Sequence, residues 1–118
     1  MKNMFWKIWA ASVLVFAFNL SFADPVWIDV RTIEEFGTDH IEGDANIPLA
    51  ELTAAKLTAR FGKDAELMLY CRSGNRAGQA KELLEAAGFT SVTNAGGIDD
   101  VRIQRGLKLA ARNSPASP

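Results

Sequence analysis

Two spacings of apolar residues alternate along residues 24–112 of this 118-residue chain. Short runs rich in β-branched, aromatic or other apolar side chains predict buried strands, and stretches with apolar residues every three or four positions predict helices. The predicted strands cover residues 26–30, 45–47, 66–70 and 91–94. The predicted helices cover residues 33–36, 49–61, 77–87 and 98–105.

Cap and stop residues mark the ends of three of these helices. Thr32 and Glu35 fit a capping box, in which the threonine side chain caps the helix and the glutamate reaches back to the cap. Gly37 is expected to break this first helix. Gly62 and Gly88 follow the second and third helices, where glycine is a common stop.

The order of these elements predicts the fold class. Strands that alternate with helices over a short chain give a small three-layer α/β domain, with a central parallel sheet flanked by helices. The nearly continuous apolar strands agree, because a parallel sheet is covered on both faces.

The first 23 residues have the pattern of a secretory signal peptide. Lys2 and Lys7 make a basic start, residues 8–20 are almost wholly apolar, and Ser21 and Ala23 provide the small residues before a cut. The alternative is a retained membrane anchor, although the apolar stretch is shorter than the roughly 20 residues that span a bilayer. Cleavage before Asp24 would release an exported protein with no stable membrane association.

Charge and length limit the function of the exported part. Without Lys2 and Lys7, eleven of the thirteen basic residues face fourteen acidic ones, which argues against a nucleic-acid partner. The length supports one small domain with one core. Residues 113–118 are polar and contain two prolines, so we expect a disordered tail.

Cys71, the only cysteine, lies between the third predicted strand and the third predicted helix. We expect its thiol on a loop at the carboxyl edge of the sheet, where ligands bind in α/β proteins. Arg72, Arg76 and a run of main-chain N–H groups there favour a thiolate, and Gly74 allows a tight turn. The competing interpretation is a buried structural cysteine.

Several segments in order resemble the rhodanese family of sulfurtransferases. They cover residues 29–31, 35–36, 40–48, 71–76, 78–80 and 94–97. The resemblance implies a rhodanese-like domain over residues 24–112, and with the signal segment it points to the small periplasmic rhodaneses of the phage-shock type. One departure is Ile98, which stands where many members have an aromatic residue.

The resemblance implies a ping-pong transfer of sulfur without a cofactor. Cys71 would attack the outer sulfur of thiosulfate, sulfite would leave, and the persulfide on Cys71 would pass its sulfur to cyanide, a thiol or a thioredoxin-like protein. Arg76 would bind the sulfonate end with two nitrogens, and Arg72 would add positive potential at the entrance. Ser73 and Asn75 would donate further hydrogen bonds, beside the amides that Gly74 brings together.

Other polar residues have simpler interpretations. We expect His40 to brace a loop, Asp29 and Arg31 to form an internal ion pair, and Glu35 with its acidic neighbours Glu34 and Asp39 to form a solvated face. The alternative for Arg76 is that it pairs with a nearby acidic side chain. No set of residues has metal-ligand spacing, so we predict no metal.

Two other functions remain open from the sequence. The first is a phosphatase or arsenate reductase of the same fold. The phosphatase signature has five residues between cysteine and arginine, whereas four separate Cys71 from Arg76, and no acid for a leaving group stands beside Cys71. The second is a non-enzymatic sulfur carrier or binding module. Both a carrier and an enzyme would pass through a persulfide.

Overall fold

The computed structural model describes residues 24–109, which contain a four-stranded parallel sheet. The strands lie in the order β2-β1-β3-β4, so the strand that carries the cysteine is central. Their bounds are β1 Val26–Asp29, β2 Ala45–Asn46, β3 Leu67–Cys71 and β4 Val92–Gly97. The predicted signal segment and tail lie outside the described residues.

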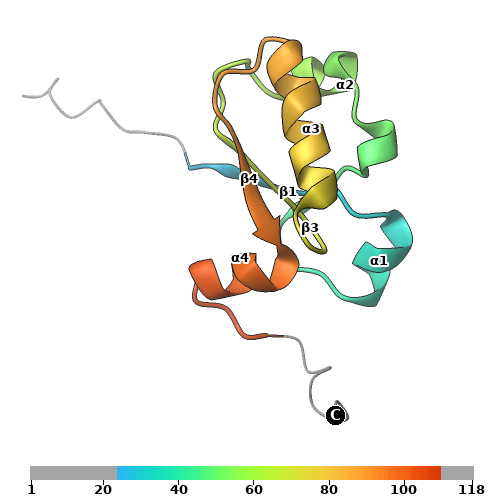
Figure 1. Cartoon of the computed structure of the whole chain (residues 1–118), viewed down its shortest axis with the longest axis vertical. Helices are drawn as coiled ribbons and strands as arrows, with labels where there is room; N and C mark the ends of the chain where they lie inside the picture. Colours follow the sequence, from blue (N-terminus) through green and yellow to red (C-terminus); the bar gives the residue numbers. More distant parts are fainter. Residues whose placement is uncertain (1–23, 110–118) are drawn as a thin grey trace, which may run out of the picture.

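Helices connect each strand to the next, as parallel pairing requires, and a last helix follows β4 (Figure 1). Their bounds are α1 Ile33–Thr38, α2 Ala54–Arg60, α3 Asn75–Ala86 and α4 Ile98–Gln104, with a short 3₁₀ helix η2 at Leu49–Glu51. Within residues 24–109 no helix is long and apolar enough to cross a membrane.

Side chains of the sheet alternate between two apolar clusters. Leu67, Leu69 and Cys71 of β3 pack in one cluster with Leu57 of α2 and Leu84 of α3. The intervening β3 residues, Met68 and Tyr70, join a second cluster with Ile98 and Val101 of α4. Figure 1 shows α2 and α3 together on one side and α4 on the other. The predicted three-layer α/β fold is therefore confirmed.

The predicted helix over residues 49–61 is two helices, so that prediction was wrong in extent. Leu52 is extended, with φ −85° and ψ 102°, and its side chain is buried. Thr53 then begins α2, because its side chain accepts a hydrogen bond from the N–H of Lys56 at 3.2 Å. Burial of Leu52 and a new cap outweigh the helical spacing of the apolar residues.

The first helix begins as predicted and ends later. Thr32 and Glu35 form the capping box, with the Glu35 N–H donating to Thr32 Oγ1 at 3.1 Å and the Thr32 N–H donating to Glu35 Oε1 at 2.9 Å. Gly37 lies inside α1 instead of breaking it. A Cβ at this position would meet no atom within 4 Å.

Candidate active site

Cys71 is the last residue of β3 and is fully buried. The strand runs one residue further than predicted, so the thiol lies at the strand end and the loop follows it. The pairing with β4 shifts register between Leu69 and Cys71, which brings Cys71 opposite Gly97. The thiol is therefore at the carboxyl edge of the central strand, on the sheet face that α3 covers.

Main-chain N–H groups surround the buried sulfur. The Gly74 N–H donates to Cys71 Sγ at 3.0 Å. Burial raises the pKa of the Cys71 thiol, but hydrogen bonds from the N–H groups of Ala77, Gly74, Ser73 and Arg76 outweigh it, and the pKa lies below its ordinary value. The amino end of α3 adds its dipole in the same sense. The site is buried, yet it stabilises an anionic sulfur.

The loop after Cys71 packs backbone against backbone on the double glycine. Gly74 has φ +102°, a conformation that favours glycine, and a Cβ there would lie 3.3 Å from the α-carbon of Gly96. A Cβ on Gly97 would collide with the carbonyl oxygen of Arg72. The close approach of these two segments explains why glycines are needed at both.

Asn94 of β4 ties the two segments together, a role that the sequence analysis missed. Its Nδ2 donates to the Gly74 carbonyl at 2.9 Å, and its Oδ1 accepts from the Gly96 N–H at 2.9 Å. An amide side chain just before a double glycine was the available signal. Asn94 thus fixes the turn that points N–H groups at Cys71.

Arg76 pairs with Glu35, the alternative that the sequence left open for it. Its Nη1 and Nη2 donate to the two carboxylate oxygens at 2.7 and 3.1 Å. Hydrogen bonds from Arg76 hold the pKa of Glu35 at about 2, and the same pair raises the pKa of Arg76. The expectation that Glu35 belongs to a solvated face was wrong.

The remaining loop side chains point away from the core. Arg72, Ser73 and Asn75 are exposed. Their side chains form no hydrogen bond or ion pair with any residue that the structure describes. Residues 72–76, the predicted substrate-binding set, follow Cys71 directly in the chain, and N–H groups from this segment hydrogen-bond its sulfur. Among their side chains, only that of Arg76 has a partner in the described part of the chain.

Comparison with known families identifies this arrangement. Residues 17–103 match the family described as rhodanese-like domain. The chain belongs to this family. It is 41% identical over 102 residues to thiosulfate sulfurtransferase PspE of Escherichia coli, covering 86% of this chain and 97% of PspE.

Solved rhodanese structures agree with the membership. A rhodanese with anions from E. coli is 43% identical, with a TM-score of 0.60 over 65% of this chain and 91% of that chain. The human single-domain sulfurtransferase TSTD1 is 29% identical, with a TM-score of 0.58 over 68% of this chain and 82% of that chain.

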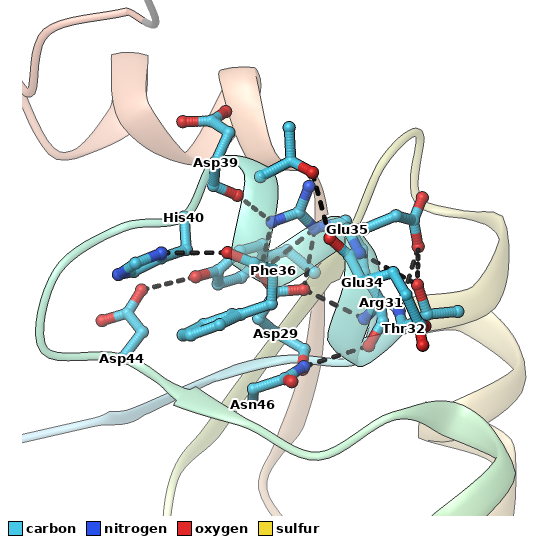
Figure 2. A network of polar contacts seen from close by, with 12 residues as sticks. Asp29, Arg31, Thr32, Glu34, Glu35, Phe36, Asp39, His40, Asp44 and Asn46 are labelled. Carbon is cyan, nitrogen blue, oxygen red and sulfur yellow. Dashed lines mark hydrogen bonds and ion pairs between the residues drawn. The ribbon is translucent and has the colours of Figure 1, made fainter.

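In this rhodanese-like domain the predicted Asp29–Arg31 pair is confirmed (Figure 2). Arg31 Nε and Nη2 donate to the Asp29 carboxylate at 3.0 and 2.9 Å, and Nη2 also donates to the Asp39 carbonyl at 2.6 Å. Asn46 Nδ2 donates to the Asp29 carbonyl at 3.0 Å. These contacts fix the chain where β1 ends and α1 begins, beside the cysteine loop.

His40 of the rhodanese-like domain braces its loop, as predicted. Its Nδ1 lies 3.0 Å from the Phe36 carbonyl oxygen, and its ring stacks on the Phe36 ring with centroids 4.2 Å apart (Figure 2). Asp39, expected on a solvated face, instead accepts from Arg102 of α4 at 2.8 Å. Both residues connect α1 to neighbouring elements.

Proposed function

We propose that the chain is a thiosulfate sulfurtransferase that works through a persulfide on Cys71. The observation that carries the proposal is the convergence of loop N–H groups on Cys71 Sγ, which lowers the pKa of the thiol despite its burial. Similarity to PspE, named a thiosulfate sulfurtransferase, supports the choice of donor. The proposed donor site includes the loop residues Arg72, Ser73, Gly74, Asn75 and Arg76.

The proposed reaction has two balanced steps. The Cys71 thiolate attacks the outer sulfur of thiosulfate, the S–S bond of the donor breaks, and sulfite leaves with the bonding electrons. The persulfide left on Cys71 is an anion, so the same N–H groups stabilise it without reorganising. A nucleophilic acceptor, either cyanide or a thiol, then takes the outer sulfur and restores the thiolate.

Access to the sulfur requires local movement. Cys71 has no exposed surface in the resting structure. The segment that follows it, residues 72–74, is short and carries the exposed side chains of Arg72 and Ser73. We propose that Arg72 and Ser73 move aside when the donor enters, while Asn94 keeps the Gly74 turn in place.

Turnover with thiosulfate and cyanide tests this function. We expect the purified protein to form thiocyanate repeatedly, which separates an enzyme from a carrier that loads sulfur once. Hydrolysis of p-nitrophenyl phosphate that depends on Cys71, without thiocyanate formation, would instead support a phosphatase.

We also propose that the protein is exported and acts in the periplasm on small donors and thiol acceptors, among them thioredoxin-like proteins. The support is the basic and apolar pattern of residues 1–23 with small residues before Asp24. Intact mass of the protein from the cell envelope tests the cut, because a mature chain that begins at Met1 contradicts it.

The pH dependence of alkylation should show the low pKa of Cys71. The rate of reaction with iodoacetamide follows the thiolate, so its midpoint should fall below that of the same cysteine in the urea-unfolded chain, about 8.5. Since the folded pKa is the lower one, ionised Cys71 also contributes to the free energy of unfolding. This contribution is fully present above the unfolded pKa and is lost as the pH falls through the folded pKa. Equal midpoints for the folded and unfolded chains would contradict the amide contribution.

A further inference from the structure

The two arginines of the cysteine loop differ in what surrounds their charge. Arg76 is fixed to Glu35 by two hydrogen bonds at 2.7 and 3.1 Å, and the two side chains are only 31% and 27% exposed. Arg72 is exposed and has no carboxylate partner among residues 24–109. A donor anion therefore meets one neutralised guanidinium group and one that is available.

A cavity of about 430 Å³ lies beside the loop and is bordered by Arg72, Glu35 and Ile98. Every charged group that lines it, except Arg72, has an oppositely charged partner in the described part of the chain. These pairs are Arg31–Asp29, Glu35–Arg76, Asp39–Arg102 and Asp99–Arg102. Arg72 is thus the one charged group of this lining without a direct ionic partner in the described part of the chain, and the lining as a whole carries three carboxylates against two guanidinium groups.

The capping box of α1 holds Glu35 toward Arg76. The Glu35 oxygen that accepts from Arg76 Nη1, Oε1, also accepts from the Thr32 N–H at 2.9 Å. The carboxylate therefore has two anchors on different elements, and it cannot swing away without giving up the cap of its own helix. Its pKa of about 2 means that it stays ionised throughout the neutral range.

We propose that Arg72 binds the anionic group of the sulfur donor, and that Glu35 sets the donor preference by neutralising Arg76. The inference rests on the proposed sulfurtransferase function and reverses the roles that the sequence suggested for the two arginines. Glu35 occupies the paired N–H groups of Arg76 that would otherwise bind two sulfonate oxygens. It also repels anions, and it repels a dianion more strongly than a monoanion.

Two donors of different charge test the proposal on the full-length protein. Thiosulfate is a dianion that releases sulfite, and benzenethiosulfonate is a monoanion that releases benzenesulfinate. Each gives its outer sulfur to the Cys71 thiolate, with the electron pair leaving on the oxidised fragment. The variants are Glu35→Gln, Arg72→Gln, Arg76→Gln and, as a matched control on the same helix turn, the exposed Glu34→Gln.

We expect Glu35→Gln to lower the KM for thiosulfate about two- to fivefold and the KM for benzenethiosulfonate less, because one surface charge is removed. Glutamine keeps an oxygen for the cap, so thermal unfolding should change little. Glu34→Gln should leave both KM values unchanged. Arg72→Gln should raise the KM for thiosulfate more than Arg76→Gln does.

The proposal is overturned if Glu35→Gln raises the KM for both donors equally, which would make Glu35 a support for a donor-binding Arg76. A larger rise in the KM for thiosulfate in Arg76→Gln than in Arg72→Gln would also assign donor binding to Arg76. An unchanged KM ratio between the donors also overturns it. These failures differ from failure of the proposed function, in which the unsubstituted protein would form no persulfide with either donor.

Discussion

Replacing Cys71 by serine should remove sulfur transfer, with a loss of at least about three orders of magnitude in the rate of thiocyanate formation. A serine hydroxyl is nearly the same size, and it can accept the Gly74 N–H that Cys71 Sγ accepts at 3.0 Å. It cannot ionise at neutral pH or hold a persulfide sulfur. The loss should therefore be chemical, and circular dichroism and thermal unfolding should match the parent protein.

The uniqueness of the cysteine makes this result easy to interpret. No second thiol in the chain can take over as nucleophile or give background alkylation. Full activity in Cys71→Ser would show that the main assignment is wrong. Loss of activity together with loss of the folded circular dichroism signal would call for Cys71→Ala, which keeps the site apolar and tests the same point.

Replacing Gly97 by alanine should cost stability and most of the activity. Gly97 has φ −95°, which any residue adopts, so the damage comes from the contact of the new Cβ with the Arg72 carbonyl oxygen and the Ser73 α-carbon. Both contacts are with backbone atoms, which cannot move aside as the end of a flexible side chain can. We expect a loss of about 1–3 kcal/mol in the free energy of unfolding and about a hundredfold in kcat/KM, as the N–H groups move away from Cys71.

Gly37→Ala is the matched control for this substitution. Gly37 lies within α1, and a Cβ there meets no atom within 4 Å. Alanine in a helix should raise the free energy of unfolding by about 0.5–1 kcal/mol and leave sulfur transfer unchanged. Urea unfolding and thiocyanate formation measure both variants. Equal behaviour of Gly97→Ala and Gly37→Ala would contradict the role assigned to the double glycine.

Local patterns in the sequence were enough to predict the layers of the fold and the position of the thiol near the sheet edge. The capping box of Thr32 and Glu35 and the ion pair of Asp29 and Arg31 join residues two or three positions apart, so spacing alone indicated them. The prediction of one helix over residues 49–61 was wrong because of a tertiary contact. Leu52 is buried against the core in an extended conformation, which periodicity does not show.

The contacts around the proposed donor site join residues far apart in the chain, so the sequence left the partner of Arg76 unnamed and did not indicate the contact of Asn94 with Gly74. Arg76 and Glu35 are 41 positions apart, and they meet because α1 lies beside the start of α3. Asn94 and Gly74 are 20 positions apart and meet through the pairing of β3 with β4. Sequence reasoning identified the arginine, but the strand order determines which partner takes up its charge.

The full burial of Cys71 also followed from the tertiary structure. The sequence predicted the thiol on a polar loop with two arginines, whereas the structure places it at the end of β3 and fully buried. Four main-chain N–H groups compensate for the loss of water around the thiolate. Burial and anionic character are therefore compatible here, and the proposed function adds that a short segment moves aside to admit the donor.

Intact-mass analysis after exposure to thiosulfate tests the central claim most directly. The account predicts an adduct of about 32 Da, one sulfur, that maps to Cys71, disappears when cyanide is added, and is absent from Cys71→Ser. A protein that stays at its original mass under these conditions, and whose Cys71 is protonated and unreactive toward alkylating reagents in the neutral range, would contradict it.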